Sequence, residues 1–267
     1  MTKQFESQLI AQDTFQQLSQ REKIQTCFSN SAQTYRCGAQ LQQRVGQTCL
    51  SKIANKKYKR ILDLGCGPGL FAPELELLTT QLISLDLSKS MLDTNPSSGV
   101  KIQSDSHKLP LQPNCFDLVF SSLMIQWCNI ETVLSEIHQI LRPGGQAVIS
   151  TLVSGTLIEL QQAWSAVDND THIHQYSTFE DIERIVNSSV WKKTNAELAT
   201  ISLKFDSVLS LAKELKLLGA NFVKDRKNKG LVTKNKWVKM EQAYLHNCGS
   251  DNSIPATYQV VYITLEK

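Results

Sequence analysis

The sequence predicts an α/β fold: a mostly parallel, seven-stranded sheet with an antiparallel edge strand and a helical lid. Short apolar segments near residues 61, 82, 100, 116 and 146 alternate with helical patterns, as parallel strands joined by right-handed crossovers do. A glycine-rich turn follows the first of these segments. Two later strands, at 201–205 and 257–265, are separated by helices, which predicts an antiparallel edge and inserted lid helices.

Length and composition favour one large intracellular domain. At 267 residues we expect a helical cap over 1–57, a ligand-binding core over 58–152, and lid insertions with the last two strands over 153–267. The net charge of +3 does not indicate nucleic acid, and no run approaches the roughly 20 apolar residues of a membrane span. Seven cysteines without a C-x-x-C pair indicate neither a disulfide framework nor a zinc site. We expect a cytoplasmic monomer.

The N-terminal part predicts helices before the first strand. Residues 1–20 are rich in glutamine and weakly patterned, whereas 24–50 carry apolar residues at helical spacing with Gly38 as a break. These helices either cap the core or bring the polar tips of Tyr35 and Gln42 over a cofactor, and both interpretations stay open. The basic stretch 51–60 is typical of a solvated surface before a strand.

The strand at 61 ends in the turn Asp63-Leu64-Gly65-Cys66-Gly67-Pro68-Gly69. Glycines lack a Cβ, so a ligand can approach the backbone N–H groups of this turn. The third glycine lies at 69 rather than 70, which departs from the dinucleotide fingerprint and disfavours a pyrophosphate. An alternative is that the glycines form only a tight loop.

Two acids at strand ends predict which ligand the turn holds. Asp63 lies in a buried strand end, where a carboxylate needs a cationic partner, and the α-ammonium of S-adenosylmethionine is such a group. Asp86 ends the strand 82–86 at the distance from Gly65 where such folds bind ribose hydroxyls. The alternative for Asp86 is a helix cap.

Further along the core, a helix over 70–79 points its N-terminus at the ligand, and Ser88 caps the helix that follows Asp86. Met91 faces the site or packs in the core. The loop 103–107 lies at the carboxyl edge of the sheet, where Asp105 accepts from the adenine amino group.

The second half of the predicted core contains the side of the site that we expect to face the transferred group. A central strand over 116–120 is followed by 121–127, which leaves the sheet at the same edge. A helix over 131–141 stops at the turn 142–145, which reverses the chain into a strand over 146–152.

The remainder is mostly helical. The patterns predict helices over 156–167, 178–190, 207–218 and 234–247, the second with a Thr178-x-x-Asp181 capping box. His172 and His174 are two residues apart, and we expect no acid or cysteine to complete a metal set with them. No catalytic triad motif occurs.

These residues resemble the class I S-adenosylmethionine-dependent methyltransferases, whose fold is Rossmann-like. The signs are D-x-G-x-G-x-G at 63–69, Asp86, Asp105 and L-R-P-G-G at 141–145. Within that class the chain is similar to the malonyl-acyl-carrier-protein O-methyltransferases of bacterial biotin synthesis. The motifs that carry this similarity lie at 28–42, 125–128, 150–157, 162–168, 215–221 and 257–262.

The resemblance implies the activity: transfer of the methyl group of S-adenosylmethionine to the free carboxylate of a malonyl thioester, leaving S-adenosylhomocysteine. It implies cofactor-binding roles for Asp63, Gly65, Cys66, Gly67, Asp86, Leu87, Met91, Asp105, Ser106 and Ser121. It implies substrate positioning by Tyr35, Gln126, Trp127, Lys216, Asn221 and Arg226, with no metal and no general base. The malonyl carboxylate is ionised near pH 7, so alignment is the main catalytic contribution.

Two positions depart from the family pattern. The family commonly has H-x-N-R-F where this chain has His-Ile-His-Gln-Tyr at 172–176, so any role of that arginine in holding a carboxylate falls elsewhere. Ser122 also stands where asparagine is usual. Two alternatives remain open: another small-molecule carboxyl methyltransferase of this fold, and a cofactor-binding partner protein without transfer activity.

Charge is unevenly distributed along the chain. Residues 213–239 contain nine basic residues and two acids, a net +7 that leaves −4 for the rest. The stretch is either a solvated helical face or a docking surface for an acidic acyl-carrier protein, with malonyl-coenzyme A as the other substrate. For the second interpretation we expect Arg226, Lys227 and Lys229 to form the patch.

Overall fold

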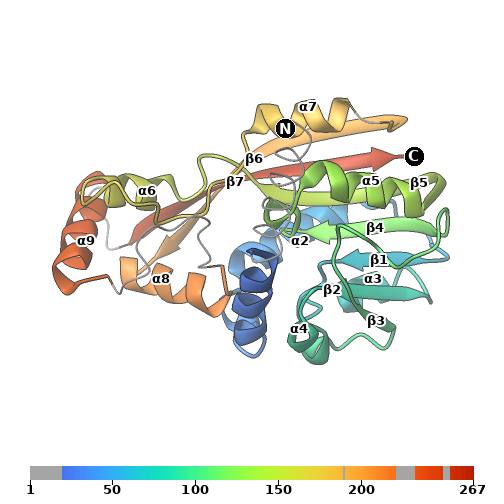
Figure 1. The fold of residues 1–267 in the computed structure, drawn as a ribbon, viewed down its shortest axis with the longest axis horizontal. Coiled ribbons are helices and arrows are strands. Elements are labelled where there is room, and N and C mark those ends of the chain that lie inside the picture. Colours follow the sequence, from blue (N-terminus) through green and yellow to red (C-terminus); the bar gives the residue numbers. More distant parts are fainter. Residues whose placement is uncertain (1–19, 189, 221–231, 249–252) are drawn as a thin grey trace, which may run out of the picture.

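The computed structural model describes residues 20–188, 190–220, 232–248 and 253–267. Seven strands form one sheet in the order β3-β2-β1-β4-β5-β7-β6 (Figure 1). Their bounds are β1 Ile61–Leu64, β2 Leu82–Asp86, β3 Val100–Gln103, β4 Phe116–Ser122, β5 Leu141–Leu152, β6 Lys193–Phe205 and β7 Ile254–Glu266. The predicted α/β architecture is confirmed.

The first five strands are parallel, as the alternating pattern predicted. β1 lies between β2 and β4, and all four of its residues are buried. Successive residues of a strand face opposite sides of the sheet, so Ile61 joins one core cluster while Leu62 and Leu64 join the other. The carboxyl ends of the parallel strands therefore meet along one edge of a sheet that is covered on both faces.

The antiparallel edge is larger than the sequence predicted. β7 pairs antiparallel with both β5 and β6, and β6 runs from Lys193 rather than from Ile201. Its first eight residues are mostly exposed, because β6 is the last strand of the sheet and its outer half has little packed against it. Exposed edge residues lack the alternation of apolar side chains by which strands are found in a sequence.

Apart from η2, which the sequence did not predict, the helices of the core and of the N-terminal part agree with the prediction in place and differ in length. After a helix that includes residues 20–31 come η1 Tyr35–Gly38, α2 Gln40–Ser51, α3 Ala72–Glu76, α4 Lys89–Thr94, η2 Ile125–Trp127 and α5 Ile130–Ile140. Gly38 does end one helical segment. Ser88 caps α4 by accepting from the Met91 N–H at 3.2 Å. α3 is only five residues long, shorter than the predicted 70–79.

Residues 142–145 differ from the prediction of a chain-reversing turn. Leu141 already pairs with Phe116, and the next paired residue of β5 is Gln146, which lies opposite Leu118. The four residues between them bulge out of β5, with Gly144 at a φ of +76°. A bulge accommodates the extra residues without ending the strand.

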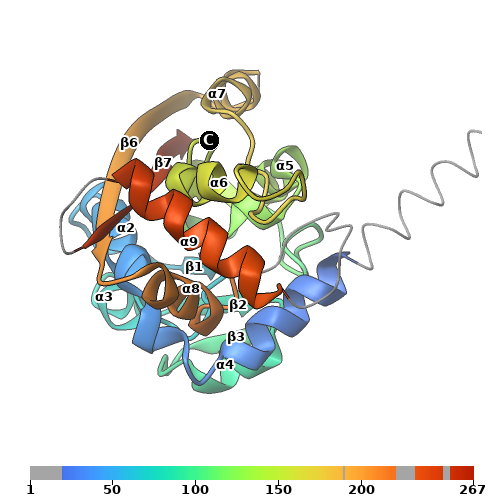
Figure 2. The same ribbon diagram turned by 90° about the vertical axis from the view of Figure 1, so that its left-hand side faces the viewer.

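The helices that follow β5 are α6 Ile158–Ser165, α7 Phe179–Asn187, α8 Val208–Leu217 and α9 Lys234–Cys248. Thr178 caps α7 as predicted, accepting from the Asp181 N–H at 3.1 Å. Helices α6, α8 and α9 gather at one end of the molecule, at the left of Figure 1, and Figure 2 looks onto this end. The helix that includes residues 20–31 lies between α8 and the parallel strands (Figure 1). No helix in the described ranges is long and apolar enough to cross a membrane.

Candidate functional site

A cavity, partly open to solvent, lies at the carboxyl ends of β1, β2, β3 and β4. We call it the glycine-turn cavity because Gly65 and Gly67 form part of its wall. Both have positive φ, +69° and +51°, a conformation that side chains disfavour. A Cβ at Gly65 would lie 2.2 Å from Cγ of Met124, whereas one at Gly67 would have no atom within 4 Å. The open space at Gly67 is therefore room for a ligand against the backbone.

Asp86 joins the glycine turn to the start of α4. Its carboxylate accepts from the N–H groups of Gly67 and Ser88, each at 2.8 Å. Burial raises the pKa of Asp86, although its hydrogen bonds from backbone N–H groups oppose the rise. Each carboxylate oxygen keeps a second lone pair, so the group can still accept a hydrogen bond from a ligand hydroxyl.

Asp63 is only 3% exposed, behind the glycine turn. Burial, followed by the negative charge of Asp86, raises the pKa of Asp63 to about 8. Its carboxyl group therefore holds a proton at neutral pH in the ligand-free protein. A cation bound nearby would favour the ionised form.

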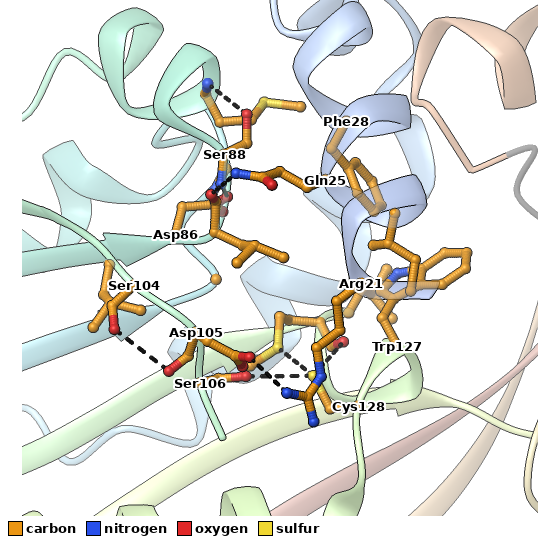
Figure 3. A pocket seen from close by; sticks show the side chains of 18 of the residues that line it. Arg21, Gln25, Phe28, Asp86, Ser88, Ser104, Asp105, Ser106, Trp127 and Cys128 are labelled. Carbon is orange, nitrogen blue, oxygen red and sulfur yellow. Dashed lines mark hydrogen bonds and ion pairs between the residues drawn. The ribbon is translucent and has the colours of Figure 1, made fainter. Parts of the chain in front are cut away.

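Asp105 is held by Arg21, from the helix that includes residues 20–31 (Figure 3), and by His107 of its own loop. It accepts from Arg21 at 3.0 Å, and from the ring and backbone N–H groups of His107 at 2.6 and 2.9 Å. His107 Nε2 accepts from the Asn129 N–H at 2.9 Å, so Nδ1 carries the proton that binds Asp105. Burial alone would raise the pKa of Asp105, but the bonds to His107 and the charge of Arg21 outweigh it and lower the pKa to about 2.

The helix that includes residues 20–31 covers the glycine-turn cavity (Figure 3). Gln25 donates to the carbonyl of Leu87 at 2.8 Å, and the hydroxyls of Ser29 and Ser88 share a hydrogen bond of 2.8 Å. The ring of Phe28 meets the ring of Trp127 edge-on, with centroids 5.6 Å apart. These contacts join the helix to the ends of β2 and β4.

The cofactor-binding residues named from the sequence fall into two groups. Those that line the glycine-turn cavity are Gly65, Gly67, Asp86, Leu87, Met91, Asp105 and Ser106. Asp63, Cys66 and Ser121 are buried and are not among its lining residues. Ser121 donates to the carbonyl of Leu64 at 2.8 Å, which joins the ends of β4 and β1. Burial, then Asp63 and Asp86, raises the pKa of the Cys66 thiol.

A second cavity, the lid cavity, adjoins the first. Phe28, Tyr35, Leu123 and Trp127 line both cavities. Gln126 and Gln42 line only the lid cavity, so Gln42 is not placed against the glycine turn. Gln126 donates to the carbonyl of Leu123 at 2.6 Å and accepts from Thr151 at 3.4 Å, which fixes its amide. Two ligands could thus meet at the Tyr35 and Trp127 wall.

The remaining substrate-positioning candidates lie elsewhere. Lys216 is exposed on α8 and lines neither cavity. Asn221 and Arg226, together with Lys227 and Lys229, lie outside the described residues.

The expectation that no acid would form a set with His172 was wrong, although His174 is not part of the group. Asp168, Asp170 and His172 present oxygen and nitrogen atoms within 4.8 Å of one another. His172 lies 2.7 Å from Asp168 and stacks on Trp164, with ring centroids 3.8 Å apart, while Lys236 donates to Asp168 at 2.6 Å. The lysine supplies the positive charge that a cation would otherwise bring, so the cluster joins α9 to the segment after α6.

Arg21, Gln25 and Arg36 are site residues that the sequence reasoning missed. Arg36 donates to the carbonyls of Pro68 and Gly69 and so holds the outer part of the glycine turn. Each of these contacts joins two residues that are between 32 and 84 positions apart in the sequence. An exposed polar residue on a helix does not reveal a partner at such a distance. Arg21 and Gln25 are four apart, the spacing of one helix face, and that is the signal that could have found them.

Known proteins are similar to the chain over its core and over its whole length. A family model described as a methyltransferase domain matches residues 62–149. The malonyl-[acyl-carrier protein] O-methyltransferase of Hamiltonella defensa is 32% identical over 95% of this chain and 98% of that protein. The enzyme of that name from Legionella pneumophila is 30% identical, over 90% and 88%. The biotin biosynthesis bifunctional protein BioHC of Cellvibrio japonicus is 33% identical over 97% of this chain. The match covers 54% of the length of that protein.

Solved structures agree on the fold. The YcgJ protein of Bacillus subtilis superposes with a TM-score of 0.59 at 12% identity, covering 84% of this chain and 98% of that one. Phosphoethanolamine N-methyltransferase 2 of Haemonchus contortus, in complex with S-adenosyl-L-methionine, superposes with a TM-score of 0.54 at 18% identity, covering 90% and 57%. The chain has the fold of the class I methyltransferases and, on the identity and coverage of its relatives, belongs to the malonyl-[acyl-carrier protein] O-methyltransferase family.

Proposed function

We propose that this chain transfers the methyl group of S-adenosylmethionine to the free carboxylate of a malonyl thioester carried on acyl-carrier protein, and so serves biotin synthesis. Family membership supports the reaction. The observation that carries it here is the pair of adjoining cavities that share Tyr35 and Trp127 as a wall. A methyl donor and an acceptor must touch, and two cavities with one common wall allow that contact.

The glycine-turn cavity fits S-adenosylmethionine. The space at Gly67 would admit the cofactor against the backbone, and Asp86 offers free lone pairs to ribose hydroxyls. Asp105 is fixed beside the cavity as an acceptor for the adenine amino group. Asp63 would lose its proton as the α-ammonium binds. When bound, the cofactor supplies an electrophilic methyl group on its sulfonium.

The lid cavity fits an acyl substrate that needs orientation rather than a base. Tyr35, Gln126 and Trp127 would position the malonyl carboxylate, which is already ionised at neutral pH. His172 is bound to Asp168, and His174 Nε2 lies 3.2 Å from the carbonyl of Gln126. Both histidines thus have partners within the described chain.

Three further expectations remain proposals. The parts 1–57, 58–152 and 153–267 act as cap, cofactor-binding core and lid. The protein is a cytoplasmic monomer that binds neither nucleic acid nor membrane and needs no metal. Its partner is an acidic carrier protein, with malonyl-coenzyme A as a carrier-free substrate.

Methyl transfer to malonyl-carrier protein, malonyl-coenzyme A and aconitate, compared side by side, tests the proposal. We expect transfer to both malonyl thioesters at a rate that stays flat from about pH 6.5 to 8.5, because the carboxylate is ionised throughout. A profile that followed a group near pH 6.5 would reveal a histidine base instead. Transfer to aconitate alone would indicate another carboxyl methyltransferase. Cofactor binding without transfer to any acceptor would indicate a non-catalytic partner protein.

A further inference from the structure

Glu214 is an acid that lines the lid cavity. Of the residues that the structure describes around the lid cavity, it is the only aspartate, glutamate, lysine or arginine. The other lining residues are aliphatic and aromatic side chains, two amides and two histidines. An isolated charge in such surroundings is costly, so its presence calls for a physical explanation.

The fold directs Glu214 into the cavity. It lies three positions after Leu211 and four before Leu218, both buried, and therefore on the inner face of α8. A Cβ built on Gly38 would lie 3.1 Å from Cγ of Glu214, so the side chain packs against the end of η1. Lys213 and Lys216 are exposed, on other faces of the same helix.

The helix that carries Glu214 is fixed at its carboxyl end. Ser31 donates to the carbonyl of Lys216 at 3.3 Å, and Thr34 donates to the carbonyl of Leu217 at 3.0 Å. A Cβ at Gly219 would lie 2.8 Å from the carbonyl oxygen of Cys27, so the two backbones are in close contact. These contacts hold the carboxyl end of α8 against the segment 27–34.

No cation within the described parts of the chain forms an ion pair with Glu214. Burial raises the pKa of Glu214, and among the described residues no hydrogen bond or opposite charge offsets that rise. Tyr258, which also lines the lid cavity, has its pKa raised by burial and then by the charge of Glu214. The field of this carboxylate thus extends into the space where a substrate would lie.

We propose that Glu214 is a specificity residue that admits malonyl compounds with one charged end and rejects those with two. The inference rests on the proposed function. A malonyl thioester is anionic at its carboxylate and neutral at its thioester. Repulsion from Glu214 places the neutral end toward α8 and leaves the carboxylate for the Tyr35 and Trp127 wall, where the lid cavity meets the glycine-turn cavity. Free malonate would bring a second carboxylate to Glu214 and bind poorly.

Malonate and monomethyl malonate test the proposal, because they are similar in size and differ in the charge of the far end. Methyl transfer to each gives a ratio of kcat/KM values. We expect wild-type protein to favour monomethyl malonate by roughly tenfold or more, the scale of a like-charge contact in a partly solvated site. Glu214→Gln should bring the ratio close to one, mainly through faster reaction of malonate. A gain of activity is a readout that a damaged structure would not give.

Two matched variants serve as controls. Glu214→Asp keeps the charge and should keep the preference, whereas Glu183→Gln removes an exposed acid of α7 and should leave the ratio unchanged. A wild-type ratio near one would overturn the proposal. An unchanged ratio in a folded Glu214→Gln protein would also overturn it. If wild-type protein methylates malonyl thioesters, either result leaves the proposed function standing; absence of that reaction would instead refute the function itself.

Discussion

The glycine-turn cavity and the lid cavity share a wall but are built differently. Around the first, carboxylates and backbone groups hold one another: Asp86 accepts from Gly67 and Ser88, and Asp105 from Arg21 and His107. Around the second, most of the lining is apolar, and one carboxylate lies without an ion pair in the described chain. A preformed polar frame specifies its ligand closely, whereas an apolar cavity selects mainly by size, shape and charge.

The largest expected effect comes from Gly67→Ala. A Cβ there has free space in the ligand-free protein but projects where the cofactor would approach, so we expect at least about a hundredfold loss of S-adenosylmethionine affinity in calorimetry. The positive φ of +51° adds strain of roughly 1 to 2 kcal/mol, measurable as a lower Tm.

Gly144→Ala is the matched control, since Gly144 also has a positive φ and no atom within 4 Å of a built Cβ, but lies in the β5 bulge outside both cavities. It should share the stability loss and keep the affinity. Equal affinity losses in the two variants would show that the glycine turn has no special role.

Asp86→Ala should weaken cofactor binding by about 1 to 3 kcal/mol, because the variant loses an acceptor for ribose and the bond that positions Gly67. Calorimetry measures the affinity, and thermal unfolding measures stability in parallel. If Asp86 only caps the chain at Ser88, stability would fall while affinity stayed unchanged.

Asp63 predicts that the stability of the folded protein depends on pH. Its pKa is about 8 in the folded protein and near its ordinary value of 3.8 in the unfolded chain. Between these values the folded state binds the extra proton, so stability falls as pH rises from about 4 to 8 and the loss is complete above pH 8. Asp63→Asn should remove this slope, a difference on the order of several kcal/mol in denaturant unfolding. Parallel slopes in both proteins would contradict the assignment.

The smallest expected effect concerns the lid. Reversing Lys227 and Lys229 to Glu should lower kcat/KM for malonyl-carrier protein several-fold at low salt, because electrostatic steering is screened as salt rises. Malonyl-coenzyme A should be affected less. Reversal of Lys56 and Lys57, in the basic stretch before β1, is the control; a stronger response there would move the docking surface to that side of the molecule.

The difference between the glycine-turn cavity and the lid cavity explains which site residues the sequence could predict. The glycine turn, Asp86 and Asp105 follow consecutive strands, so strand periodicity and the rule that parallel strands end at one edge place them together. Arg21 reaches Asp105 across 84 positions, and no local pattern carries that contact. Glu214 looked like part of a solvated basic helix, because only packing against η1 reveals that it faces inward. The outer half of β6 was missed for a related reason: exposed edge residues carry no burial pattern.

The fluorescence of Trp127 can report on the wall that the two cavities share. Of the four tryptophans it alone lines both cavities; Trp164 lines only the lid cavity, while Trp191 and Trp237 line neither. Its indole emission will change when either ligand enters, without any added dye. In stopped-flow mixing, the amplitude and rate of that change therefore distinguish ordered from random addition of donor and acceptor, and Trp127→Phe supplies the blank.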